Sequence, residues 1–288
     1  MDTDFKYIPG QLVKAANKEK TLSLDSYLSK VNIPKILENK QFKYKSFSLN
    51  LCYVSIILDS TASQTDSWDA IQNGIEKIIE DIARLADIEL KIAIIAYRDY
   101  CDHKVIEFHP YTSDINKLKS FSKNIECTGG GANDAEASEL GLNKAKNLYK
   151  EISSTKKGKG IFVLIGDEAA YGVKVSLNKK KANDIFWLDE VNEIKDLNVP
   201  IYSIFTGYDE KDRNYFDECS KLTKGKLFNL SSIDTLSEML ISILTGIIAA
   251  EIGELDNYQN LLIFDGRNSA ANKNLLEDLR SHIAYKEE

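Results

Sequence analysis

Short, nearly continuous apolar runs alternate with longer amphipathic stretches along residues 51–230. Four of these runs are strong, and they cover residues 51–58 (LCYVSIIL), 92–97 (IAIIAY), 160–166 (GIFVLIG) and 199–205 (VPIYSIF). Weaker runs occupy 104–108 and 226–230. Runs of this kind are typical of strands in a mostly parallel sheet that helices cover on both faces. The sequence therefore predicts a layered α/β fold.

The stretches between the runs have helical spacing. Between the first two runs, apolar residues recur at intervals of three and four, which places one apolar stripe on a helix. These residues are Trp68, Ile71, Ile75, Ile78, Ile79, Ile82 and Leu85. Similar spacing predicts helices over 135–148, 185–197, 216–222 and 236–250. Strands and helices that alternate in this way favour a doubly wound sheet.

Length and composition limit the classes of function that remain. The 288 residues carry 37 Lys and Arg against 44 Asp and Glu, a net charge of −7, which disfavours binding to a phosphate backbone. No segment reaches about 18 uncharged apolar residues, and we expect no membrane span. The four cysteines form no CxxC pair, which argues against a zinc knuckle or a disulfide framework. We expect a soluble protein of the cytoplasm.

Polar oxygen-bearing residues follow two of the predicted strands. Asp59, Thr61 and Ser63 come directly after the first strong run, and Asp167 follows the run at 160–166. Ligands of open α/β sheets gather at the carboxyl ends of the strands, where the strand order reverses. Two carboxylates brought together there repel each other unless a proton or a cation intervenes. Oxygen ligands without His or Cys suit Mg²⁺, with Mn²⁺ and Ca²⁺ as alternatives.

A glycine-rich loop, TGGGANDAE at residues 128–136, opens the helix that precedes the run at 160–166. Together with DSTAS at 59–63 and IGD at 165–167, it resembles the metal-ion-dependent adhesion site of a von Willebrand factor type A domain. The stretch IAYRDYCDH at 95–103 and the CTGGG segment are most similar to the intracellular branch of that family found beside alpha-type kinases. The resemblance spans roughly residues 47–250.

The resemblance implies a set of metal ligands. The family motif Asp-x-Ser-x-Ser corresponds to Asp59, Thr61 and Ser63, with Thr61 in place of a serine. Asp134 takes the place of the loop threonine of the family, although Asn133 and Thr128 remain alternatives. Asp167 matches the last acidic position, which often acts through water. Glu136 and Glu168 are left out of the ligand set and interpreted as acids that favour the first turn of a helix, with a place around the direct ligands as the alternative.

The resemblance also implies an architecture and a function. It implies a doubly wound sheet with one short antiparallel edge strand, for which 104–108 is the candidate. We expect a domain over 46–250, with an N-terminal extension (1–45) and a C-terminal helical extension (251–288). Family members bind protein partners, and a partner carboxylate completes the coordination of the metal. The helix at 236–250 corresponds to the last helix of the family, which can shift to change affinity.

Two alternatives remain. A Mg²⁺-dependent phosphohydrolase or phosphotransferase could use Asp59 as its nucleophile. Enzymes of that kind, however, have a second acid two residues after the nucleophile, and this position is occupied by Thr61. No P-loop or GxSxG motif is present, and His103, His109 and His282 lie near no nucleophile motif. The other alternative is a metal-free scaffold that keeps the fold with a degenerate site.

Overall fold

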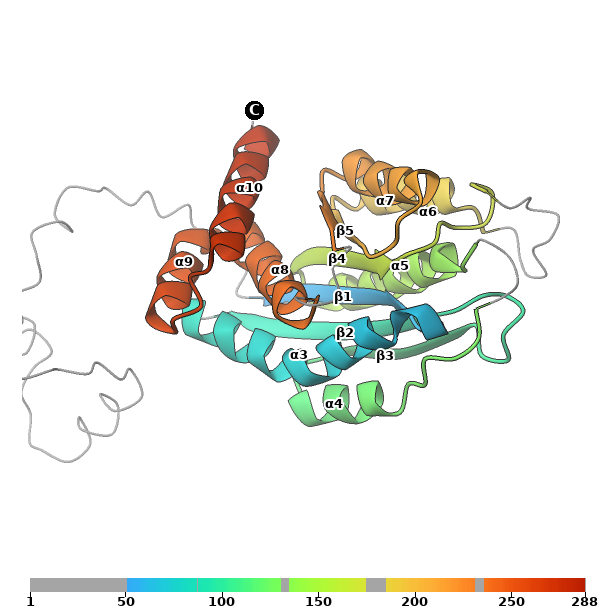
Figure 1. Ribbon diagram of the computed structural model, residues 1–288, viewed down its shortest axis with the longest axis horizontal. Helices are drawn as coiled ribbons and strands as arrows, with labels where there is room; N and C mark the ends of the chain where they lie inside the picture. The colour runs from blue at the N-terminus through green and yellow to red at the C-terminus, as the bar shows by residue number, and fades with distance from the viewer. Residues whose placement is uncertain (1–50, 87, 131–134, 175–184, 231–235, 288) are drawn as a thin grey trace, which may run out of the picture. The chain divides into compact units, whose positions relative to one another are not determined.

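The computed structural model describes residues 51–86, 88–130, 135–174, 185–230 and 236–287. The predicted N-terminal extension lies outside these ranges. The described residues belong to one compact unit built around a six-stranded sheet with the strand order β3-β2-β1-β4-β5-β6 (Figure 1). The strands are β1 (Leu51–Asp59), β2 (Glu89–Tyr97), β3 (Ile106–Thr112), β4 (Lys159–Gly166), β5 (Ile201–Phe205) and β6 (Leu227–Asn229).

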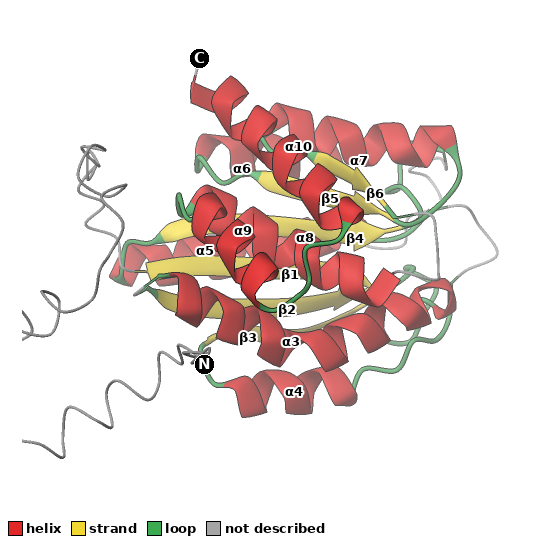
Figure 2. Cartoon of the chain, turned by 60° about the vertical axis from the view of Figure 1, so that its left-hand side comes forward, coloured by secondary structure: helices red, strands yellow, loops and turns green. Residues whose placement is uncertain are grey.

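Helices cover both faces of this sheet (Figure 2). One face carries α3 (Thr65–Leu85), α4 (Ile115–Lys123) and α8 (Leu236–Glu251), and the other carries α5 (Ser138–Thr155), α6 (Trp187–Asp196) and α7 (Glu210–Leu222). All strand pairs are parallel except β2 with β3, which are antiparallel. The predicted fold class, a doubly wound and mostly parallel sheet with one antiparallel edge strand, is confirmed.

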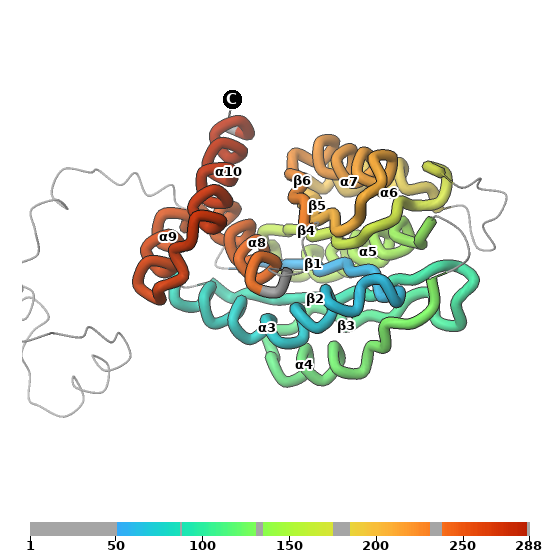
Figure 3. The backbone as a smooth tube through the Cα atoms, viewed as in Figure 1, coloured from blue at the N-terminus to red at the C-terminus, as the bar shows by residue number. Residues whose placement is uncertain are grey.

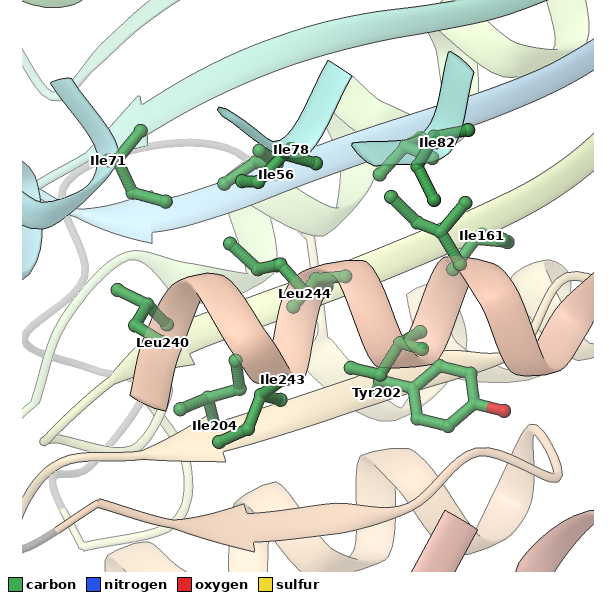
Figure 4. Close-up of a cluster of buried hydrophobic side chains, with 14 of the residues drawn as sticks. Ile56, Ile71, Ile78, Ile82, Ile161, Tyr202, Ile204, Leu240, Ile243 and Leu244 are labelled. Atoms are coloured by element: carbon green, nitrogen blue, oxygen red, sulfur yellow. The ribbon is translucent and has the colours of Figure 1, made fainter. Parts of the chain in front are cut away.

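Alternate side chains of β1 pack into two separate cores, because successive side chains of a strand point to opposite faces of the sheet. Ile56 and Leu58 pack with α3 and α8, whereas Tyr53 and Ile57 pack with α5. Figure 4 shows the first of these cores, in which α8 presents Leu240, Ile243 and Leu244 to the strands. Each fully buried side chain of this size contributes about 1.5–3 kcal/mol. This burial explains why β1 reads as a continuous apolar run.

A small residue lets α3 and α8 approach closely. A Cβ atom at Gly74 of α3 would lie 2.4 Å from side-chain carbons of Ile241 on α8. No real Cβ contact is that short, so a larger residue at this position would require the Ile241 side chain or the helices themselves to shift. The absence of a side chain at Gly74 therefore leaves room for Ile241 between the two helices.

Two further helices follow α8 and close the end of the first core. They are α9 (Leu255–Phe264) and α10 (Ala270–Glu287), which Figure 3 shows as the last turns of the tube beside α8. These helices bury Tyr258, Leu262 and Leu279 almost fully in the same core as Ile56 and Leu58 of β1. None of the described helices is long and apolar enough to cross a membrane.

Several boundaries differ from the sequence-based expectations. The antiparallel edge strand was expected at 104–108 and runs instead over Ile106–Thr112, because residues 100–104 form the turn that reverses the chain and the Arg98 amide donates to the Val105 carbonyl. β5 begins at Ile201, since Pro200 has no N–H to give to a strand pair. The short helix α4, capped by the Asp114 carboxylate, was not predicted.

Candidate functional site

The strand order reverses between β1 and β4, and the candidate site lies at this point. β1 and β4 are parallel neighbours, with Leu58 opposite Ile165. Asp59 ends β1, and Asp167 comes directly after β4. Both acids are therefore at the same carboxyl edge of the sheet, as the sequence predicted.

The Asp59 side chain is completely buried, and only one of its oxygens is satisfied. Oδ1 accepts a 2.7 Å hydrogen bond from the Thr61 amide, whereas Oδ2 has no hydrogen-bond partner. The carbonyl oxygen of Asp59 accepts a 2.8 Å hydrogen bond from the Trp68 indole. The backbone is thus anchored to α3, while one carboxylate oxygen is left to interact with something else.

Two hydroxyl groups lie in the turn that follows Asp59. Thr61 is 2% exposed and precedes the 3-10 turn η2 (Ala62–Gln64), in which Ser63 is exposed. The Thr61 and Ser63 hydroxyl oxygens are 3.1 Å apart. The DSTAS segment at residues 59–63, called the first motif below, therefore brings a carboxylate and two hydroxyls into one short turn. Ser63 of this motif is exposed to solvent.

Asp167 contributes a second carboxylate to the same region. It is half-buried, and its Oδ1 atom also lacks a hydrogen-bond partner. Burial raises the pKa of Asp59 well above its usual range, and the charge of Asp167 and a direct interaction with its side chain act in the same direction. The two carboxylates are thus close enough to compete for one proton or to share one cation.

Glu136 brings a third carboxylate, which the sequence analysis assigned to the first turn of a helix. That assignment is wrong, because α5 begins only at Ser138. The Glu136 amide instead donates to the Ala169 carbonyl, beside Asp167, and the residue is 3% exposed. Its Oε2 atom has no partner, and burial together with the charge of Asp59 raises its pKa to about 11. Glu136 is the last residue of the TGGGANDAE segment, but its position beside Asp59 depends on the tertiary contact with Ala169.

The glycine-rich loop passes directly over the first motif. The Thr128 amide donates to the Ser60 carbonyl, and Gly129 and Gly130 both have positive φ angles, 80° and 86°. A Cβ atom at Gly130 would lie 3.4 Å from Cβ of Thr61 and 3.8 Å from Oε1 of Glu136. The positive φ angles favour glycine at both positions, whereas a Cβ atom at Gly130 would make only ordinary van der Waals contacts with Thr61 and Glu136.

Part of the predicted ligand set lies outside the described residues. Asp134 and Asn133 belong to residues 131–134. Of the other predicted ligands, Asp59, Thr61 and Ser63 share one turn, and Asp167 interacts with Asp59. Thr128 is exposed on the loop that borders them. The choice between Asp134, Asn133 and Thr128 as the loop ligand stays a prediction.

These groups fit a hard cation chemically. Asp59, Glu136 and Asp167 each have a buried carboxylate oxygen without a hydrogen-bond partner, and the nearby neutral donors are hydroxyl oxygens. Such oxygens are the ligands that Mg²⁺, Mn²⁺ and Ca²⁺ prefer. Across the ranges that the structure describes, no three His, Cys, Asp or Glu side chains are arranged as a ready metal cage. A cation here would therefore also need the hydroxyl oxygens of the first motif.

Solved structures with TM-scores above 0.5 support the fold. No family model matches the chain. The pilus adhesin SpaC from Lactobacillus rhamnosus GG, in an open conformation, matches 70% of this chain and 30% of its own, with a TM-score of 0.52 and 12% identity. A von Willebrand factor type A structure from Catenulispora acidiphila matches 69% of this chain and 42% of its own at 12% identity, with a lower TM-score of 0.45.

One curated protein also aligns with the sequence. It is a putative ariadne-like RING finger protein, R811, of Acanthamoeba polyphaga mimivirus, 23% identical over 194 residues. The alignment covers 62% of this chain and 18% of the viral protein. The chain thus spans about a fifth of this relative.

Proposed function

We propose that this chain is a protein-binding module of the von Willebrand factor A type that depends on a divalent cation. Asp59, Thr61 and Ser63 would bind the cation directly, Asp134 would supply the loop ligand, and Asp167 would act directly or through water. Mg²⁺ is the first choice, with Mn²⁺ or Ca²⁺ possible. Membership of the branch found beside alpha-type kinases, and a location in the cytoplasm, remain part of the same proposal.

One observation carries this proposal. The carboxylates of Asp59 and Asp167 lie together at the point of strand reversal, and each has a buried oxygen with no hydrogen-bond partner. Unpaired buried carboxylates are costly, and a cation would remove that cost. Two hydroxyl oxygens 3.1 Å apart follow Asp59 in the same turn, which suits a site made entirely of oxygen ligands.

Glu136 would support the site without belonging to the predicted ligand set. Its buried carboxyl group lies beside Asp59 and Thr61 with a raised pKa, and a cation at that position would stabilise its ionised form. Groups that surround the direct ligands commonly tune metal affinity by ten- to a hundredfold. The three carboxylates together would also make the binding of a small, doubly charged ion preferable to that of a monovalent one.

The partner would present an acidic side chain to this site. A divalent ion with one open coordination position attracts a carboxylate strongly and directionally, even on a protein of negative net charge. Ser63 is exposed beside the buried Thr61, so the first motif opens to solvent on one side. A protein carboxylate could approach from that side.

The first test is a cation titration of the full chain after treatment with EDTA. Mg²⁺ should raise the thermal midpoint, because a ligand at a hundred times its Kd adds about 2.7 kcal/mol of stability. Asp59→Asn, which keeps an acceptor for the Thr61 amide, should abolish this rise. Asp66→Asn, at an exposed position in the first turn of α3, is the matched control and should behave as the unsubstituted chain.

Two results would count against the proposal. If Mg²⁺, Mn²⁺ and Ca²⁺ all leave the midpoint unchanged, the metal-free scaffold becomes the better description. If Mg²⁺-dependent hydrolysis of an aryl phosphate appears and is lost with Asp59→Asn, the site is enzymatic.

A further inference from the structure

A polar pocket opens beside the candidate metal site. Its cavity of about 390 Å³ lies between the turn that joins β2 to β3 and the segment that follows α4. Asp102 and Lys104 contribute from the turn, Glu126 and Thr128 from the segment, and Arg98 from the end of β2. The pocket is large enough for one long side chain of a partner.

The Arg98 guanidinium holds the two walls of the pocket together. It is 4% exposed, and one of its terminal nitrogens donates to the Lys104 carbonyl (2.9 Å) and to Oε1 of Glu107 (3.0 Å). The other terminal nitrogen donates to the Glu126 carbonyl at 2.7 Å. Because these bonds tie both walls to one buried cation, the pocket is formed before any ligand arrives.

The charge of the pocket is negative once its internal pairs are counted. Glu107 forms ion pairs with both Arg98 (3.0 Å) and Lys104 (3.1 Å). The Asp102 carboxylate accepts hydrogen bonds from the backbone amides of Asp99 (3.1 Å) and Gly130 (3.3 Å). These bonds hold the side chain in place, but the donors are neutral and do not form an ion pair with it. The three carboxylates of the lining, those of Asp102, Glu107 and Glu126, thus outnumber its Arg98 and Lys104 side chains. A basic side chain complements this balance.

One loop separates this pocket from the candidate metal site. On one side, a Cβ atom at Gly129 would lie 2.1 Å from Oδ1 of Asp102, which lines the pocket. On the other side, Gly130 lies against Thr61 and Glu136 of the candidate metal site. A peptide that reaches the metal site can therefore reach the pocket within a few residues.

We propose that this pocket binds a basic side chain, Lys or Arg, of the same partner whose acidic side chain completes the coordination of the cation. The link between the two subsites depends on the function proposed above, whereas the recognition of a basic group by the pocket does not. The partner sequence recognised by this module would then carry an acidic residue and a basic residue close together.

The pocket is tested directly with N-acetyl-arginine methylamide and its neutral isostere, N-acetyl-citrulline methylamide. His103 lines the pocket, and the NMR resonances of its ring, assigned with His103→Gln, report binding to the full chain without metal. The arginine compound should shift these resonances in a saturable way, and the citrulline compound should bind at least fivefold more weakly. Equal shifts by the two compounds, or no shift by either, would overturn the proposal.

A substitution at Glu126 tests whether the arginine compound binds in this pocket. Glu126→Gln removes the exposed carboxylate but keeps the backbone carbonyl that Arg98 binds, and it should weaken arginine binding about two- to fivefold, the range of an exposed ion pair. Glu151→Gln, an exposed residue in the last turns of α5 at the opposite edge of the sheet, is the control and should have no effect. Unchanged arginine binding in Glu126→Gln would contradict the assignment.

A second experiment distinguishes binding at the pocket from binding at the candidate metal site. Short synthetic peptides with Asp and Arg at varied spacing are titrated with Mg²⁺ and with EDTA. Mg²⁺ should strengthen the best of these peptides by about tenfold or more, and replacing its arginine by citrulline should reduce that affinity. If the arginine compound binds but Mg²⁺ adds nothing to any peptide, the pocket is upheld and the metal-dependent function fails.

Discussion

Two buried carboxylates lie at opposite ends of the strands, and they differ in the charge of the side chains around them. Asp59, at the carboxyl end of β1, is next to Asp167 and keeps one oxygen without a hydrogen-bond partner. Glu251, at the end of α8, forms ion pairs with Lys159 (2.7 Å) and Lys286 (2.5 Å) and accepts a hydrogen bond from the Tyr202 hydroxyl.

The pKa values of the two acids follow these surroundings. Burial acts to raise the pKa of both, and at Asp59 the neighbouring acid raises it further. At Glu251 the two lysines outweigh burial and hold the pKa at about 2. Burial alone therefore does not mark a functional acid. What distinguishes Asp59 is burial without a cationic partner, which is the arrangement expected where an external cation binds.

The largest effect is expected when the partnered acid is removed. Glu251→Ala leaves Lys286 and the Tyr202 hydroxyl without their acceptor, and breaking a buried ion pair in this way costs about 3–5 kcal/mol. Urea denaturation should show this loss, while Glu277→Ala on the exposed face of α10 should change stability by less than about 0.5 kcal/mol. A loss below about 1 kcal/mol would mean that the cluster is not a structural support.

The same acid predicts a pH dependence. The pKa of Glu251 is lowered from 4.5 to about 2 on folding, so its contribution is complete above pH 4.5 and disappears as the pH falls towards 2. A shift of this size corresponds to about 3 kcal/mol. The stability difference between the unsubstituted chain and Glu251→Gln should therefore shrink over this window. A difference that stays constant from pH 5 to 2.5 would contradict the lowered pKa.

A smaller loss is expected from the hydroxyl that contacts the partnered acid. Tyr202→Phe keeps the ring, which is almost completely buried between the sheet and α8, and removes only the hydrogen bond to Glu251. A hydrogen bond to a charged group is worth about 1.5 kcal/mol at the low end of its range. Chemical denaturation at neutral pH measures this loss. Tyr285→Phe, at an exposed tyrosine of α10, provides the control.

The smallest effect should have the opposite sign. In EDTA, Asp59→Asn removes an acid whose pKa burial and Asp167 raise on folding, which costs stability at neutral pH, and the new amide can donate to the unpaired Oδ1 of Asp167. We expect the variant to be more stable by about 1 kcal/mol, the net value of one hydrogen bond. Equilibrium unfolding in EDTA checks this sign. A loss of more than 1 kcal/mol would show that Asp59 supports the fold, as Glu251 does.

The fold was largely predictable because burial on both faces leaves a clear signature. The runs that became β1, β2 and β4 are apolar throughout, and alternating strands and helices restrict the sheet to few strand orders. Asp59 and Asp167 could be placed at one edge because they directly follow parallel strands. The bounds of the edge strand β3 were harder to predict, because the strand is half-exposed and a turn rather than a burial pattern sets its first residue.

The contacts that the sequence did not reveal join distant segments. Glu136 reaches the candidate site because its amide pairs with Ala169, and Glu251 is neutralised by lysines 92 and 35 residues away in the chain. Neither contact has a local motif, since each depends on how complete elements pack. Helix α4 was missed because its apolar stripe is short, with Leu118 as its fully buried apolar residue.

The hydrogen bond from the Trp68 indole to the Asp59 carbonyl gives the chain an intrinsic optical reporter. Trp68 is 1% exposed and is bonded to the backbone of the candidate ligand itself, whereas Trp187, the second tryptophan of the chain, is half-exposed against Tyr215. Indole fluorescence responds to charge and polarity nearby, so Trp187→Phe would leave an emission spectrum that reports on the end of β1 alone. Events at that edge of the sheet become visible without any attached dye.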